Sequence, residues 1–155
     1  MKILMVCLGN ICRSPLAEGI MNEKIRKYNL KAATDSAGTA AYHVGEIPDP
    51  RSIEVAQKNS IDITYQRARR FSREDFNRFD RIYAMDESNY YDLISMARNE
   101  EEKSKVEMIL NVINPGENAS VPDPYYGGTD GFDKVFAMLD NACEKIASDL
   151  ATMNH

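Results

Sequence analysis

The sequence predicts an α/β fold, a three-layer sandwich in which a central four-stranded parallel sheet is flanked by helices on both faces. Short apolar runs alternate with helical patterns along the chain, which is the order of strands and crossover helices in a parallel sheet. The first run, ILMVC at residues 3–7, is apolar throughout, as expected of a strand that is covered on both faces. The length of 155 residues fits one compact unit, so we expect a single domain over residues 1–155.

The first half of the chain is expected to add a second strand and two helices. Ser14 is predicted to cap a helix whose first residue is Pro15, because serine and proline favour these two positions. Asp49 and Pro50 are predicted to start another helix, which runs to about Asn59. Between these helices we expect a weaker strand at residues 31–36 and an irregular loop at residues 37–48.

The second half of the chain is expected to complete the sheet and to end in a long helix. Ser72 and Asp75 resemble a capping box for a short helix. Apolar residues on one face, from Phe132 to Leu150, indicate the last helix. Between these two helices we expect, in order, a strand at residues 81–86, a helix at about 87–98, a polar linker at 99–105, a strand at 106–110 and a long loop at 114–130.

Composition narrows the possible classes of function. The formal net charge of −5 argues against a nucleic acid or an anionic membrane surface as partner, although it leaves room for a local positive pocket. The apolar run at residues 2–8 is too short for a secretory or membrane segment, so we expect a cytoplasmic protein. With three cysteines and two histidines, we expect neither a disulfide framework nor a structural metal site. The prediction is thiol chemistry without a metal or a cofactor.

The segment VCLGNICRSP, residues 6–15, follows the first predicted strand and opens the first predicted helix. In parallel α/β folds, ligands bind beyond the carboxyl ends of the strands. A glycine-containing turn before a helix N-terminus gathers backbone N–H groups into a cradle for a phosphate-like anion. We expect Gly9 and Asn10 to take positive φ angles in this turn, and the Arg13 guanidinium to bind two oxygens of the anion.

Cys7 stands at the first position of this cradle and is predicted to be a nucleophile. Donors that stabilise a phosphate also stabilise a thiolate, so Cys7 is expected to be reactive at neutral pH. Phosphoryl transfer to its sulfur would give a phosphocysteine, with Arg13 and the loop amides holding the transferred oxygens. Ser14 is placed to donate to the departing thiolate when water attacks.

A carboxyl group must protonate the leaving group and afterwards activate water. Asp123 in the segment VPDPYYGG, residues 121–128, is the candidate. Pro122 and Pro124 on either side of Asp123 stiffen this loop, and Tyr125 and Tyr126 can line a pocket for an aryl group. An Asp-Pro pair alone is weak evidence, because Asp49-Pro50 repeats it at a predicted helix start.

The two segments together resemble the low-molecular-weight protein tyrosine phosphatases, and the resemblance extends over essentially the whole chain. CLGNICRSP at residues 7–15 matches the phosphate loop of that family, and DPYY at residues 123–126 matches its general-acid loop. The resemblance implies a phosphatase I-like fold and hydrolysis of protein phosphotyrosine, with small aryl phosphates as surrogate substrates. It implies that Cys7 is the nucleophile, Arg13 the phosphate clamp, Asp123 the general acid and base, Ser14 a donor to the thiolate, and Leu8, Tyr42, Tyr125 and Tyr126 residues of the substrate cleft.

The same resemblance implies how the phosphate-binding loop is held. Besides Cys7 and Arg13, this loop is expected to contain Leu8, Gly9, Asn10, Ile11, Cys12 and Ser14. Asn10 would keep the loop in shape with the help of Ser36. Many relatives have a histidine that hydrogen-bonds to the loop asparagine where this chain has Gln66, and an amide can donate the same kind of bond. Cys12 could simply pack, but the interpretation we favour is a redox partner that traps an oxidised Cys7 as a disulfide.

Three other functions stay open. Protein arginine phosphatases resemble this loop, but they tend to have threonine where Ile11 stands and lack the tyrosine pair. Thioredoxin-coupled arsenate reductases need further cysteines near the third strand, and residues 80–95 contain none. A non-catalytic phosphoprotein-binding module would use the same cradle, although the set Cys7, Arg13 and Asp123 speaks for catalysis. The expected partners are phosphotyrosine-containing proteins or peptides, and phosphate or other oxyanions bound in the loop.

Overall fold

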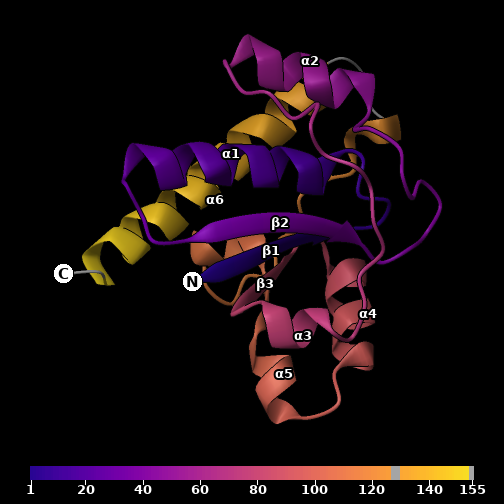
Figure 1. Ribbon diagram of the computed structural model, residues 1–155, viewed down its shortest axis with the longest axis vertical. Coiled ribbons are helices and arrows are strands. Elements are labelled where there is room, and N and C mark those ends of the chain that lie inside the picture. Colours follow the sequence, from indigo (N-terminus) through magenta and orange to yellow (C-terminus); the bar gives the residue numbers. More distant parts are fainter. Residues whose placement is uncertain (127–129, 154–155) are drawn as a thin grey trace.

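The computed structural model describes residues 1–126 and 130–153, and of Tyr126 the backbone alone. Within these residues the chain forms a four-stranded parallel sheet with the strand order β2-β1-β3-β4 (Figure 1). The strands are β1 (Lys2–Cys7), β2 (Ala33–Gly38), β3 (Arg81–Ala84) and β4 (Val106–Met108). The predicted fold class, a four-stranded parallel sheet between helices, is confirmed.

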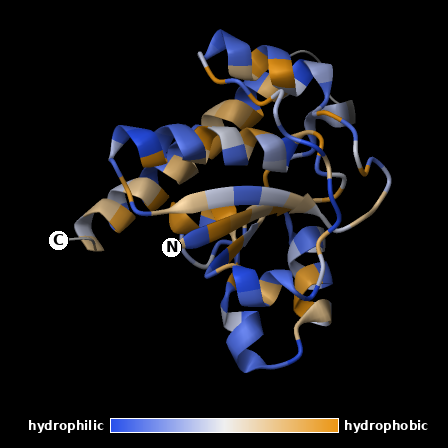
Figure 2. Cartoon of the chain, viewed as in Figure 1, coloured by the Kyte–Doolittle hydropathy of each residue, from blue (hydrophilic) through white to orange (hydrophobic). Residues whose placement is uncertain are grey.

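Helices lie on both sides of this sheet (Figure 1). On one side are α1 (Arg13–Lys27), α2 (Pro50–Lys58) and α6 (Asp130–Met153), and on the other are α3 (Asp75–Arg78), α4 (Glu87–Met96) and α5 (Glu100–Ser104). In Figure 2 the hydrophobic residues gather on β1 and on the helix faces that cover the sheet, whereas α5 is almost entirely hydrophilic. Within the described ranges, no helix has both the length and the apolar character needed to cross a membrane.

β1 occupies the centre of the sheet and contributes to two apolar cores. Met5 packs in the core beneath α1 and α6, and Leu4 packs in the core beneath α3 and α4. Successive side chains of a strand point to opposite faces, so both faces of β1 need apolar residues, which explains the uninterrupted run in the sequence. β2 pairs with one side of β1 and β3 with the other. The carboxyl end of β1 at Cys7 is therefore a topological switch point, where ligands of parallel sheets bind.

The polar linker predicted at residues 99–105 is wrong, because α5 occupies most of it. Asn99 caps this helix by accepting a hydrogen bond from the Glu102 backbone N–H at 2.9 Å. The first turn contains three glutamates, which favour the positive end of the helix dipole. Arg98 also ion-pairs with Glu102 at 2.7 Å. The composition that looked like a solvated linker is also that of a short, exposed helix.

Several predicted boundaries also shift. The strand predicted at 106–110 ends at Met108 and is followed by a 3-10 turn at Ile109–Val112, and the helix predicted at 87–98 ends at Met96. The strand predicted at 31–36 extends to Gly38, two residues into the predicted loop. Of the capping box predicted for Ser72 and Asp75, one bond is present, because the Ser72 backbone N–H donates to the Asp75 carboxylate at 2.9 Å, although α3 itself begins only at Asp75.

Candidate active site

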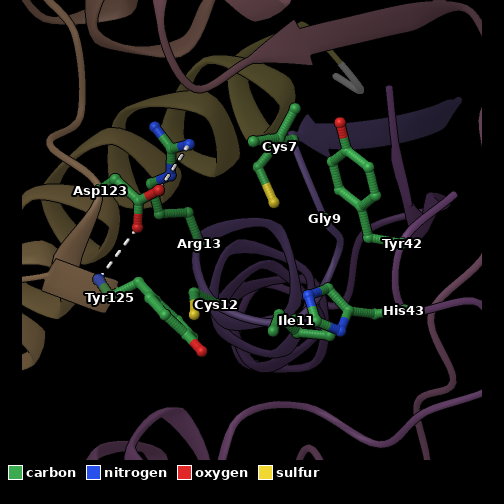
Figure 3. A pocket seen from close by; sticks show the side chains of 10 residues that line it. Cys7, Gly9, Ile11, Cys12, Arg13, Tyr42, His43, Asp123 and Tyr125 are labelled. Atoms are coloured by element: carbon green, nitrogen blue, oxygen red, sulfur yellow. Dashed lines mark hydrogen bonds and ion pairs between the residues drawn. The ribbon is translucent and has the colours of Figure 1, made fainter. Parts of the chain in front are cut away.

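A cavity of about 200 Å³ opens at the carboxyl end of β1 (Figure 3). Its walls come from the loop between β1 and α1, the segment after β2, and the loop before α6. The residues that line it are Cys7, Leu8, Gly9, Ile11, Cys12, Arg13, Tyr42, His43, Asp123 and Tyr125. The fold thus brings together most residues that the sequence analysis singled out, from segments more than 100 residues apart.

Ser14 does not cap α1, contrary to the sequence prediction. The helix begins at Arg13 and its capping residue, Cys12, makes no side-chain capping bond. The hydroxyl of Ser14 instead lies 3.0 Å from the Cys7 sulfur and accepts a hydrogen bond from the Asn10 amide at 2.8 Å. Because a hydroxyl has one proton, acceptance from Asn10 leaves that proton for the sulfur. Ser14 is therefore oriented as a hydrogen-bond donor to a Cys7 thiolate.

Asn10 is the central residue of the loop. Within the loop at residues 7–13, Asn10 has a left-handed backbone, with a φ of 57°, as predicted. Its side-chain amide donates to Ser14 and also to the Ser36 hydroxyl at 3.0 Å, and its oxygen accepts from the Arg69 backbone N–H at 3.0 Å. These bonds connect the loop to β2 and to the segment that precedes α3. The predicted contact between Asn10 and Ser36 is present.

Gly9 does not share the positive φ that was predicted for it. A side chain at this position is restricted in another way, because a Cβ atom built on Gly9 would lie 3.1 Å from the His43 ring. That distance is closer than ordinary van der Waals contact. Glycine at position 9 therefore permits the close approach of the loop to His43, rather than a special backbone conformation.

The segment after β2 holds the start of the loop. The backbone N–H groups of Thr39 and Ala40 donate to the carbonyls of Cys7 and Leu8 at 2.9 and 3.0 Å. A Cβ atom on Gly38 would lie only 2.7 Å from the Leu8 carbonyl oxygen. Gly38 is thus required for this close contact between two backbones.

Gln66 supports the loop, but by a different route from the predicted one. Its side-chain nitrogen donates to the Pro15 carbonyl at 2.9 Å, and both amide hydrogens of Asn10 are directed at hydroxyls. Gln66 reaches Asn10 only through Ser36, whose hydroxyl lies 3.4 Å from the Gln66 oxygen. Gln66 therefore does not make the bond to Asn10 that the sequence analysis allowed for its amide.

Glu18 is a member of this network that the sequence analysis missed. Its buried carboxylate accepts hydrogen bonds from the Ser36 hydroxyl and the Tyr65 hydroxyl, each at 2.7 Å. Burial raises the pKa of Glu18, and these two hydroxyls oppose the shift. The spacing could have revealed it, because Glu18 lies four residues after Ser14 and therefore on the same face of α1.

Arg13 is almost fully buried, at 3% exposure, and its position is fixed by two acceptors. One terminal nitrogen, Nη1, donates to the Asp86 carboxylate at 2.7 Å and to the Val121 carbonyl at 2.9 Å. The other, Nη2, lies 3.9 Å from Asp123. Asp86 also caps α4 through the Asn89 backbone N–H. The sequence analysis gave no role to Asp86, although its place after the third predicted strand put it at the ligand-binding edge of the sheet.

Asp123 and two aromatic residues form the outer part of the cavity (Figure 3). One carboxylate oxygen of Asp123 accepts from the Tyr125 backbone N–H at 2.9 Å, and the other faces Arg13. Tyr42 and Tyr125 are exposed on the cavity walls, as is Leu8. The side chain of Tyr126, also predicted to line the cleft, lies outside the described residues.

Cys12 lines the same cavity as Cys7, and both are free thiols. Burial raises the pKa of Cys12 to about 12, and the negative charges of Asp49 and Asp123 add to this effect. Cys12 is therefore protonated at neutral pH, although it lies at the N-terminus of α1, where the helix dipole favours an anion. Its role as redox partner of Cys7 stays a prediction.

Comparison with known proteins gives one consistent result. The family model described as low molecular weight phosphotyrosine protein phosphatase matches residues 2–154. A protein of that description from Schizosaccharomyces pombe is 42% identical over 153 residues, or 97% of each chain. A protein tyrosine phosphatase from Entamoeba histolytica, solved with Hepes in its active site, is 39% identical with a TM-score of 0.92, over 100% of this chain and 99% of that one. The Drosophila arginine phosphatase DARP is 33% identical with a TM-score of 0.89, over 96% and 97%.

The left-handed backbone and the hydrogen bonds of Asn10 can be tested separately. Asn10→Ala removes the side-chain bonds and places alanine, which adopts the left-handed region less readily than asparagine, at this position, so we expect the free energy of unfolding to fall by about 3 kcal/mol. Asn10→Gly removes the same bonds without the backbone strain and should lose about 1 kcal/mol less. Chemical denaturation measures both values.

Asn29 provides a matched control, because it is an exposed asparagine with a similar φ of 52° at the far end of α1. Asn29→Ala should lower stability through the backbone alone and leave the affinity for inorganic phosphate, measured by calorimetry, unchanged. Equal losses for the two Asn10 variants would contradict the left-handed conformation at residue 10.

Proposed function

The chain belongs to the low molecular weight phosphotyrosine protein phosphatase family, and we propose that it hydrolyses phosphotyrosine in proteins through a phosphocysteine on Cys7. The observation that carries the proposal is the position of the Cys7 sulfur. It lies in a cavity lined by Arg13 and Asp123, at 3.0 Å from a hydroxyl oriented to donate to it. A nucleophile, a phosphate-binding cation and a carboxyl group thus share one small space.

The phosphate group would bind in the loop between Cys7 and Arg13. Backbone N–H groups at the start of α1 and the guanidinium of Arg13 offer donors to a tetrahedral oxyanion. Arg13 is already held by Asp86 and Val121, so little side-chain freedom is lost when the anion binds. The Entamoeba relative supports this assignment, because its active site holds Hepes, whose sulfonate is also a tetrahedral oxyanion.

In the first chemical step, the Cys7 thiolate attacks phosphorus and an S–P bond forms while the bond from phosphorus to the phenolic oxygen breaks. The proton of the Asp123 carboxyl passes to that oxygen, so the product leaves as a neutral phenol. Arg13 and the loop amides hold the three equatorial oxygens as charge redistributes. The carboxylate of Asp123 faces the cavity and is partly exposed, which lets it meet a leaving group that enters from solvent.

In the second step, the Asp123 carboxylate takes a proton from water, and the water oxygen attacks phosphorus. The S–P bond breaks and its electron pair returns to the sulfur of Cys7. Ser14 stabilises that departing thiolate through its hydrogen bond. Phosphate leaves, and Asp123 is again protonated for the next cycle.

The walls of the cavity favour an aryl substrate. Tyr42 and Tyr125 provide aromatic surface on two sides of the cavity (Figure 3), and Leu8 is an exposed apolar residue of its lining. A phenyl ring can stack on such walls while its phosphate reaches the sulfur. Phosphoserine is shorter and lacks an aromatic ring, so we expect it to bind more weakly.

Phosphoarginine is the second candidate substrate, because a similar structure is that of an arginine phosphatase. Two features of this chain favour phosphotyrosine, namely Ile11 in the loop and the tyrosine pair after Asp123-Pro124. Arsenate reduction has less support. The third cysteine, Cys143, is fully buried on α6 beneath α1, where it cannot exchange with a thiol in the cavity.

The covalent role of Cys7 has a direct test. Cys7→Ser should abolish hydrolysis of phosphotyrosine peptides, because a serine hydroxyl is not ionised at neutral pH, while inorganic phosphate should still bind in the loop. Steady-state assays on matched phosphotyrosine, phosphoserine and phosphoarginine peptides measure turnover and substrate choice together. Appreciable turnover by Cys7→Ser would reject the phosphocysteine, and a preference for phosphoarginine would replace the proposed substrate.

The proton-donor role of Asp123 predicts a dependence on the leaving group. Asp123→Ala should lower kcat/KM for phenyl phosphate by about 100-fold or more, because phenolate is a poor leaving group without a proton. For 2,4-dinitrophenyl phosphate, whose leaving group departs readily as an anion, the loss should be far smaller. Similar losses for the two esters would remove Asp123 from the role of acid.

A further inference from the structure

Arg51, the second residue of α2, is held in one orientation by the residue that caps its helix. The Asp49 carboxylate accepts from the Arg51 backbone N–H at 2.8 Å and from two guanidinium nitrogens, Nε and Nη2, each at 3.0 Å. Asp49 is itself buried. A two-point bond of this kind fixes the plane of the guanidinium as well as its distance.

The start of α2 is attached to the phosphate-binding loop. The Asp49 backbone N–H donates to the Ile11 carbonyl at 2.8 Å, and the Ser52 hydroxyl donates to the Cys12 carbonyl at 3.2 Å. Two consecutive carbonyls of the loop are thus bonded to residues on either side of Arg51. The guanidinium has a defined position relative to the loop because both are tied to the same helix start.

The opposite side of Arg51 contacts the loop that carries Asp123. Its Nη1 donates to the Tyr125 carbonyl at 3.1 Å, and its guanidinium carbon lies 5.0 Å from the centre of the Tyr125 ring and 4.7 Å from that of Phe132. The same Tyr125 donates its backbone N–H to the Asp123 carboxylate at 2.9 Å. One residue thus links Arg51 to the carboxyl group that faces the cavity.

These contacts form a continuous connection from Ile11 through Asp49, Arg51 and Tyr125 to Asp123. The connection matters because proton transfer depends steeply on the distance between acid and leaving group, and a misplacement of 1 Å can cost about 100-fold in rate. Val121 and Pro124 are buried, whereas Asp123 and Tyr125 are both partly exposed, so packing restrains these two side chains less than the rest of the loop. The guanidinium supplies a bond and two ring contacts at that point.

We propose that Arg51 is a positioning residue for proton transfer, which sets the place of Asp123 by clamping its loop to the phosphate-binding loop. The proposal rests on the proposed role of Asp123 as the acid. Arg51 is not among the residues that line the cavity, and its guanidinium contacts four groups at once: a carboxylate, a carbonyl and two aromatic rings. Lysine cannot make these contacts together, because its ammonium is a compact point charge without a planar fork.

The test compares the variant Arg51→Met with the wild type on two esters. Loss of the clamp should lower kcat/KM for phenyl phosphate by about 10-fold, and by less than about 2-fold for 2,4-dinitrophenyl phosphate, which needs little protonation. Arg51→Lys should give an intermediate loss with the same dependence on the leaving group. Because kcat/KM includes only the steps up to the departure of the first product, it reports the proton transfer to the leaving group that Asp123 assists.

Lys58 provides a matched control in the same helix. It forms an ion pair with Asp133 of α6 at 2.9 Å, so Lys58→Met also removes a cation that joins α2 to α6, but at the opposite end of α2 from the phosphate-binding loop. This variant should keep kcat/KM for both esters. A loss with Lys58→Met equal to that of Arg51→Met would show a general effect of loosening α2 and would overturn the proposal.

The double variant Arg51→Met with Asp123→Ala separates this inference from the proposed function. If Arg51 acts through Asp123, replacing Arg51 should lower kcat/KM for phenyl phosphate by less than about 2-fold once Asp123 is absent.

Two results would overturn the positioning role while leaving Asp123 as the acid. One is a loss in kcat/KM from Arg51→Met that is as large in the Asp123→Ala background as in the wild type. The other is an equal loss for both esters in the single variant Arg51→Met. If Asp123→Ala itself shows no dependence on the leaving group, the proposed function fails instead. Should Arg51→Met unfold, the ratio of the two esters in Arg51→Lys decides the same question.

Discussion

The contact between the Cys7 sulfur and the Ser14 hydroxyl depends on the side chain of Asn10. Asn10 donates to Ser14 and so directs the single proton of that hydroxyl towards the sulfur. It can do so because its backbone adopts the left-handed conformation, which turns the loop back on itself before α1 begins. Without this turn, Ser14 would be free to act as the ordinary helix cap that its sequence position suggests. The Ser14 hydroxyl thus donates to the nucleophile instead of capping α1.

Around that contact, the site is assembled from segments that the sheet order brings to one edge. Arg13 is held by Asp86 at the end of β3 and by Val121. The Asp123 carboxylate accepts a hydrogen bond from Tyr125, and Tyr125 in turn accepts one from Arg51 of α2. Arg13 and Asp123 are thus each held by hydrogen bonds to neighbouring residues. Binding of phosphate to such a prearranged set costs little reorganisation, and this is the condition under which fixed dipoles and charges accelerate a reaction.

The parts of the structure that the sequence predicted are those set by neighbours in the chain. The apolar run of β1, the Asp49 cap of α2 and the amphipathic pattern of α6 all rest on local spacing. Two misses, the role of Ser14 and the partner of Arg13, came from contacts that close only in the folded chain. Ser14 has a good capping sequence, but a sulfur from the preceding strand competes for its hydroxyl. Likewise, Arg13 and Asp86 lie 73 positions apart in the sequence, so no local pattern predicts the bond between them.

The central claim is that the sulfur of Cys7 accepts the phosphoryl group, and mass spectrometry of the enzyme denatured during turnover tests it most directly. In Asp123→Ala, which lacks the carboxyl group that activates water, 2,4-dinitrophenyl phosphate should still transfer its phosphoryl group, while hydrolysis of the intermediate should be slow. We therefore expect a phosphoryl group on the peptide that contains Cys7 and Cys12, with fragment ions that place it on Cys7. No phosphorylated cysteine during turnover, or a phosphoryl group on Cys12, would contradict the claim.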